Sequence, residues 1–120
     1  MVKIQVICAA LSMMFTRPTP DFSIASGYGI DPDFAKAVAV VESGWMHDSN
    51  LAIRKNNIYG LIGKEFSSID ECIHYFCRLM KRNYRTDDID MIAKRYCPPN
   101  AEEWARKVRG IMWKLKNLIH

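Results

Sequence analysis

The sequence predicts a mainly α-helical, compact domain with one short irregular lobe. Apolar residues recur at helical spacing along most of the chain, and acidic, Ser or Asn helix-start signals precede several of these stretches. Only residues 46–66 lack a sustained period, and they are rich in Asn, Gly and Ser. The chain has 120 residues, enough to bury one core. We therefore treat residues 1–120 as one domain with an N-terminal helical segment over 1–30.

Composition and residue spacing argue against a nucleic-acid site and a metal site. The formal net charge is +4, and many basic residues lie on the polar side of the last predicted helix, so a solvated helix face explains them better than a nucleic-acid site. Cys8, Cys72, Cys77 and Cys97 have no metal-ligand spacing, and the three histidines form no cluster. We expect reduced, mostly buried thiols, with a disulfide that involves Cys8 or Cys97 as the alternative, and no metal or cofactor.

Residues 2–15 are apolar on nearly all sides and predict a buried first helix, although an opening alternation leaves a strand open. The apolar run is too short to span a bilayer. A signal sequence or anchor is the alternative, but no clean cleavage site follows. Pro18 and Pro20 end the segment, because proline cannot continue a helix.

A short helical turn, a bend and a helix start precede the stretch that contains the main candidate residue. Asp21 can cap a short helical turn over 21–26, and residues 27–29 form a tight bend. Asp31-Pro32-Asp33 then predicts a strong helix start.

Glu42 lies at the shoulder of the apolar stripe of this helix. Counted from Phe34 at about 100° per residue, Val38 and Val41 fall within about 60° of the stripe centre and Glu42 about 80° away. Ser43-Gly44 follows at once, which predicts the helix end. A carboxylate against an apolar wall has a raised pKa and can act as a general acid. An ordinary half-covered boundary residue is the competing interpretation.

Further helices follow the irregular segment. Ser68 and Glu71 form a capping-box pattern before a helix, Asp87 or Asp88 caps a short one, and Asn100 caps the last, with Glu103 in the reciprocal position. The last helix has an apolar core stripe comprising Trp104, Val108, Ile111, Leu115 and Leu118. We interpret Trp45 and Trp104 as packing residues.

The order of these signals resembles a known family. ESGW at 42–45 is followed by Ala52, NNIYG at 56–60 and FSSIDECI at 66–73, and then by IAKRYCPP at 92–99 and NAEEWARKV at 100–108. This order resembles the lysozyme superfamily, most closely the peptidoglycan N-acetylglucosaminidases of glycoside hydrolase family seventy-three, with the soluble lytic transglycosylase domain as a near relative. The resemblance covers about two-thirds of the chain, residues 29–108, and implies a lysozyme-like fold whose irregular lobe borders a cleft.

The resemblance implies roles for individual residues. Glu42 matches the acid that protonates the glycosidic oxygen, and Tyr96 matches the tyrosine that faces it across the cleft. Asn57, Tyr59 and Gly60 match the loop that borders the sugar groove, and we place Ser43 with them as substrate-binding. From the residues alone, Asn56 and Asn57 are better explained as turn formers, and Tyr96 is equally well explained as a core-edge tyrosine.

A second carboxylate is less clearly marked. Glycosidases commonly use two, and Asp48 and Glu65 are the candidates in the irregular lobe. The lobe after Gly60 is shorter than in the family pattern, which favours single-acid chemistry. Attack by the substrate's own N-acetyl oxygen, or lytic transglycosylation to an anhydro-MurNAc end, needs only Glu42.

The resemblance thus implies an enzyme that cleaves the β-1,4 bond between GlcNAc and MurNAc in peptidoglycan, a bacteriolytic, endolysin-like hydrolase. It would act in the bacterial cell envelope, delivered by phage or by secretion, without nucleic acid or a stable membrane span. We expect a monomer, or a part of a larger virion or envelope assembly. A non-catalytic glycan-binding or structural component is the alternative of another class.

Overall fold

The computed structural model describes residues 20–43, 55–84 and 86–119, and the side chains up to 117. Its elements in chain order are η1 (Phe22–Tyr28), α2 (Pro32–Ser43), α4 (Ile69–Asn83), α5 (Ile89–Tyr96), η2 (Pro98–Asn100), α6 (Ala101–Lys114) and the π-helical turn η3 (Leu115–Ile119). The mainly α-helical class is confirmed, and the described residues contain no strand.

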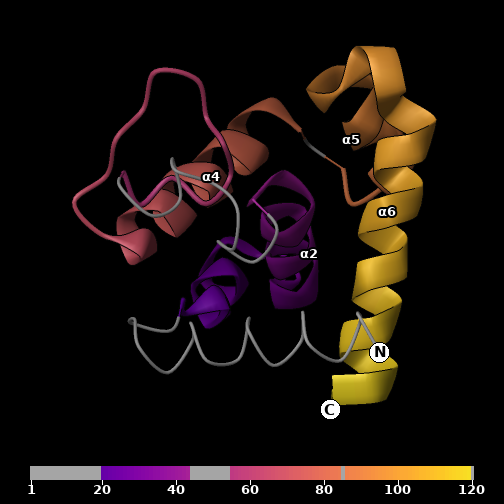
Figure 1. Cartoon of the computed structure of the whole chain (residues 1–120), viewed down its shortest axis with the longest axis horizontal. Helices are drawn as coiled ribbons and strands as arrows, with labels where there is room; N and C mark the ends of the chain where they lie inside the picture. Colours follow the sequence, from indigo (N-terminus) through magenta and orange to yellow (C-terminus); the bar gives the residue numbers. More distant parts are fainter. Residues whose placement is uncertain (1–19, 44–54, 85, 120) are drawn as a thin grey trace, which may run out of the picture.

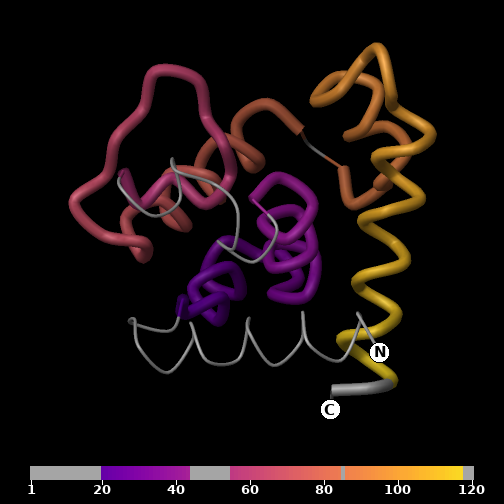
Figure 2. The backbone as a smooth tube through the Cα atoms, in the orientation of Figure 1, coloured from indigo at the N-terminus to yellow at the C-terminus, as the bar shows by residue number. Residues whose placement is uncertain are grey.

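Helix α2 occupies the middle of the fold. It packs against α6 on one side and η1 on the other, while η1 also contacts α4 and α5 packs on α6 (Figure 1). Between residues 55 and 68 the chain makes a wide excursion on the side of the molecule away from α6 (Figure 2). This excursion is the described part of the predicted irregular lobe, and we call residues 55–68 the lobe loop.

The first two helix starts form as the acidic caps predict. Asp21 Oδ1 accepts a hydrogen bond from Ser23 N at 3.1 Å and opens η1, which continues to Tyr28 and not only to residue 26. Gly29, with a φ of 72°, ends it in the left-handed conformation that glycine adopts without strain. Asp31 Oδ1 likewise accepts from Asp33 N at 2.9 Å at the start of α2.

The capping box of α4 is shifted by one residue. Ser68 Oγ accepts from Glu71 N at 3.0 Å as predicted, but the Glu71 carboxylate accepts from Ser67 N at 3.3 Å and from the Ser67 hydroxyl, and not from Ser68 N. Asp88 caps α5 by accepting from Asp90 N and Met91 N.

Asn100 occupies the N-cap position of α6 as predicted, but its side chain does not form the expected capping hydrogen bond. Asn100 is the last residue of η2, and its side chain makes no capping hydrogen bond because the η2 turn leads directly into α6. Glu103 therefore has no reciprocal role and instead pairs with Lys107 at 3.4 Å on the exposed face.

The core encloses two of the four cysteines. Cys72 and Cys77 are fully buried free thiols, and burial raises the pKa of each to about 11. A thiol with so high a pKa is almost entirely protonated at neutral pH and therefore unreactive. The predicted reduced, buried state is confirmed for this pair; Cys97 is free and half-buried, and Cys8 lies outside the described residues.

Several other predictions also fall outside the described residues: the first helix over 2–15, Gly44, Trp45, Asp48 and Ala52. Within the described part, no helix is both long and apolar enough to cross a membrane.

Candidate active site

Glu42 lies in the last turn of α2 and receives a hydrogen bond from α6. The indole Nε1 of Trp104 donates to Glu42 Oε1 at 3.0 Å. Trp104 is only 4% exposed, so its N–H is aimed at the carboxylate by a ring that the core holds in place. A buried indole N–H needs an acceptor, and here the acceptor is the candidate acid.

The surroundings of Glu42 favour its protonated form. Burial raises the pKa of the Glu42 carboxyl above its ordinary value, and the Trp104 hydrogen bond partly offsets this rise because it stabilises the carboxylate. Glu42 is nonetheless exposed as a residue, so one side of it remains open to solvent. Among the described residues, no ion pair involves it.

Tyr96, in the last turn of α5, lies beside the same pair. Its ring centroid is 5.2 Å from that of Trp104, with the planes tilted by 38°. The pKa of the Tyr96 phenol is raised far above its usual range, first by burial and then by the negative charge of Glu42. The structure therefore brings Tyr96 close to Glu42, as the resemblance implies, and keeps it a neutral phenol at working pH.

A third aromatic ring extends this arrangement away from Glu42. Tyr84, directly after α4, lies 6.3 Å from Tyr96 between ring centroids, and the Arg95 guanidinium lies 5.6 Å from the Tyr84 ring centroid. Arg95 also donates to Asn83 O at 2.8 Å, which ties the start of this linker to α5. We call Trp104, Tyr96 and Tyr84 the aromatic row.

Asn57 is a structural residue of the lobe loop. Its side chain is fully buried; Nδ2 donates to Leu61 O at 2.7 Å and Lys64 O at 3.1 Å, and Oδ1 accepts from Leu61 N at 2.9 Å. With every polar atom engaged by the loop backbone, the amide has no free group to offer a sugar. The structure thus favours the turn-forming interpretation.

Tyr59 anchors the same loop to two helices. Its ring stacks on Phe76 of α4 with centroids 3.8 Å apart, and its hydroxyl donates to Ala35 O of α2 at 2.9 Å. At 1% exposure this ring cannot cover the face of a sugar, so the predicted direct contact is replaced by a positioning role. Gly60, next in the chain, is exposed with a φ of 65° and presents backbone to solvent.

The structure describes two of the three remaining candidates, Ser43 and Glu65. Ser43 is 4% exposed, and its hydroxyl donates to Ala39 O at 2.8 Å within α2, which leaves it no accessible donor. Glu65 is exposed on the lobe loop, and Asp48 lies outside the described residues. Of the described carboxylates, none besides Glu42 contributes to the raised pKa of Tyr96, and none to that of Glu42.

Trp104 is the site residue that sequence reasoning missed. Its place at the centre of the α6 stripe indicates packing, which is correct, but packing alone leaves the indole N–H without a partner. The sequence signal that could have indicated this hydrogen bond is a buried tryptophan combined with a glutamate at the shoulder of a facing helix.

Comparison with known proteins identifies a family for the chain. A family model described as "Glucosaminidase: mannosyl-glycoprotein endo-β-N-acetylglucosaminidase" matches residues 22–117, which include every described site residue. Neither the curated proteins nor the solved structures gave a match. Because the family model covers most of the chain, the protein belongs to the glucosaminidase family and is a glycosidase.

Proposed function

We propose that this protein cleaves the β-1,4 bond on the reducing side of GlcNAc in peptidoglycan, with Glu42 as the general acid. The observation that carries the proposal is the Trp104–Glu42 hydrogen bond, in a setting that raises the pKa of the carboxyl. Family membership supports the coarser statement, cleavage of peptidoglycan glycan strands at a cell-wall-related location.

In the proposed reaction, Glu42 begins as a carboxylic acid. It transfers its proton to the glycosidic oxygen as the bond to the anomeric carbon breaks, so the leaving sugar departs as an alcohol. The Trp104 N–H then stabilises the carboxylate that has just formed, because this hydrogen bond favours the charged state. The indole thereby assists the step in which negative charge appears on Glu42.

The positive charge that develops at the anomeric carbon is stabilised without a second carboxylate from the described residues. The substrate's own N-acetyl oxygen attacks the anomeric carbon, and water later opens the resulting ring while Glu42 takes back a proton. Tyr96, held neutral by burial and by the charge of Glu42, supports the reacting sugar by hydrogen bonding without adding charge.

Single-acid chemistry keeps one related outcome open. If the bond on the reducing side of MurNAc is cut instead, and the C6 hydroxyl of that MurNAc attacks its own anomeric carbon in place of water, the protein is a lytic transglycosylase that releases anhydro-MurNAc ends. The same observation favours this second candidate: among the described carboxylates, only Glu42 contributes to the raised pKa of Tyr96.

Mass spectrometry of fragments released from purified peptidoglycan tests the proposal. Reducing GlcNAc ends support it. Anhydro-MurNAc ends assign the transglycosylase reaction, and reducing MurNAc ends overturn the proposed linkage. Binding to sacculi without any released fragment overturns the enzymatic reading in favour of a glycan-binding or structural role.

Delivery by phage or secretion, endolysin-like bacteriolysis and a monomeric state remain proposals that accompany this one. Lysis of whole cells from outside, compared with digestion of isolated sacculi, separates bacteriolytic action from cleavage alone.

A further inference from the structure

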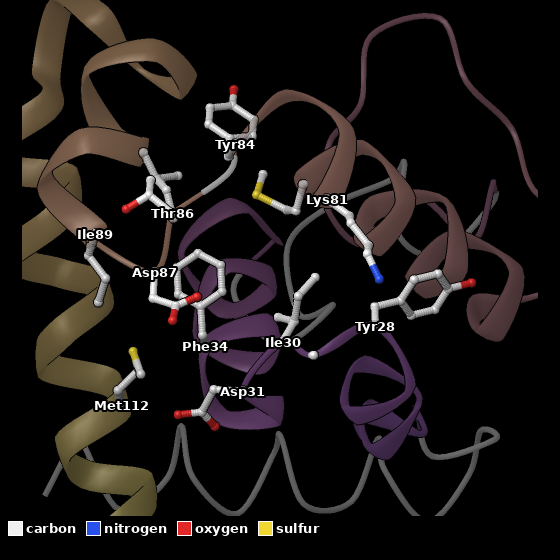
Figure 3. Close-up of a pocket in the computed structure, with 13 residues that line it drawn as sticks. Tyr28, Ile30, Asp31, Phe34, Lys81, Tyr84, Thr86, Asp87, Ile89 and Met112 are labelled. Atoms are coloured by element: carbon white, nitrogen blue, oxygen red, sulfur yellow. The ribbon is translucent and has the colours of Figure 1, made fainter.

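A pocket of about 750 Å³ lies on the described part of the molecule, and Glu42 is not among its lining residues. Its walls come from the junction of η1 and α2, the end of α4, the linker into α5, and α6 (Figure 3). This volume is within the range of pockets that hold small organic ligands.

The pocket has an apolar floor. Phe34 lies at its centre, with Ile30 and Met112 on either side (Figure 3). Phe34 lines the pocket although only 7% of the residue is exposed. Such a floor favours the aliphatic part of a ligand.

Opposite charges lie on opposite sides of this floor. Lys81 of α4 lies on the side of η1, whereas the carboxylates of Asp87 and Asp31 lie on the side of α6 (Figure 3). Asp31 pairs with Lys116 at 3.1 Å, but the ion pairs between described residues include neither Lys81 nor Asp87. Both of these side chains belong to exposed residues and are available to a ligand. A ligand carrying both a carboxylate and an ammonium group matches them.

The aromatic row connects the pocket to Glu42. Tyr84 lines the pocket and contacts Tyr96, which contacts Trp104, which donates to Glu42. Only two ring-to-ring contacts therefore separate the pocket wall from the residue that holds the acid. A branch of a polymer cleaved at Glu42 would have to extend past the aromatic row to enter the pocket.

We infer that this pocket binds the peptide stem of the peptidoglycan substrate, with a stem carboxylate at Lys81 and a stem ammonium at Asp87. The inference rests on the proposed function, since peptidoglycan is the polymer whose glycan strand carries short peptides with both kinds of charged group. The pocket makes the enzyme prefer peptide-bearing strands over bare ones.

Two substrates separate this role from catalysis: peptide-bearing peptidoglycan, and the same strands stripped of peptide by an amidase. Lys81→Gln and Asp87→Asn should each raise KM for the peptide-bearing strands by about tenfold, leave kcat unchanged, and leave both constants unchanged on stripped strands. Lys94→Gln and Glu102→Gln, exposed charges away from the pocket, are the matched controls and should change neither substrate's kinetics. Equal effects on both substrates, or none on either, overturn the inference.

A binding measurement keeps the inference testable if cleavage itself is not observed. Calorimetry with a synthetic wall tetrapeptide, bearing a free lysine ammonium and a free terminal carboxylate, should give saturable binding to the Glu42→Gln protein. Binding should weaken about tenfold when Lys81→Gln or Asp87→Asn is added. Absence of binding, or binding unchanged in both variants, contradicts the peptide site, whereas absence of cleavage with binding retained contradicts only the proposed reaction.

Discussion

Trp104 Nε1 lies 3.0 Å from Glu42 Oε1, although the two residues are 62 positions apart in the chain. This contact joins α6 to the end of α2 and opposes the effect of burial on the Glu42 carboxyl: burial raises its pKa, and the indole N–H lowers it. The pKa of Glu42 is therefore set by two opposing effects, burial and the indole hydrogen bond.

Trp104→Phe removes the N–H and keeps most of the packing. Loss of a bond that stabilises the carboxylate should raise the pKa of Glu42 further. Because a general acid works only while protonated, the alkaline limb of the pH–rate profile should move to higher pH. We also expect kcat to fall about tenfold to a hundredfold, since the carboxylate formed in the reaction loses its donor.

The pH profile of kcat on soluble glycan fragments, with circular dichroism as the control for folding, checks this prediction. An alkaline limb that stays in place or moves to lower pH contradicts the assigned contact. A loss of rate without any change in profile would mean that Trp104 acts through packing alone.

Tyr96→Phe tests the neutral phenol. The ring contacts with Trp104 and Tyr84 are kept, so the fold should be retained. We expect kcat to fall by about tenfold to a thousandfold with KM little changed, because in the proposed reaction the hydroxyl supports the reacting sugar and not ground-state binding. Steady-state kinetics check this. An unchanged kcat would assign Tyr96 to the core edge.

Asn57→Ala tests the structural role of the NNIYG motif. It removes three hydrogen bonds from a fully buried site and leaves backbone groups without partners, which should cost about 2–4 kcal/mol of unfolding free energy. Ile62→Ala is the control in the same loop. Its side chain is 97% exposed, so its cost should stay below about 0.5 kcal/mol. Urea titrations of the two variants decide; equal stabilities would contradict the assignment.

The raised pKa of Glu42 also predicts a stability effect. A carboxyl whose pKa is higher in the folded than in the unfolded protein stabilises the fold only at low pH, and this contribution is lost as the pH rises through the folded value. Glu42→Gln should therefore be slightly more stable than the wild type at pH 7, by less than about 1 kcal/mol because Glu42 is exposed as a residue. The difference should vanish or reverse near pH 4. Thermal melts at both values measure it, and a variant less stable at pH 7 would indicate a structural role for the ionised carboxylate.

Local patterns predict the helices well because helix starts are decided within a few residues. The acidic caps at Asp21, Asp31 and Asp88 form as expected. Asn100 takes the predicted N-cap position but makes no side-chain capping bond, because Pro98 and Pro99 open a turn that runs directly into α6. A pattern of residue types does not show whether a preceding turn will replace a side-chain cap.

The site is less readable from sequence because its contacts are long-range. Glu42 and Tyr96 can be selected from helix position and resemblance, but the Trp104 contact depends on how α6 crosses the end of α2. For Asn57 and Tyr59, in contrast, the resemblance implies a direct role in sugar binding that the structure does not support. Their residue types suit sugar binding, yet both side chains are buried and hold the loop, which only the packing reveals.

Release of soluble muropeptides from purified sacculi by Glu42→Gln, compared with the wild type, tests the central claim most directly. Glutamine keeps the shape of the side chain and can still accept the indole hydrogen bond, but it has no acidic proton to transfer. We predict that the variant binds sacculi as the wild type does and releases fragments at least about a thousandfold more slowly. Release at the wild-type rate would contradict the assignment of Glu42 as the acid.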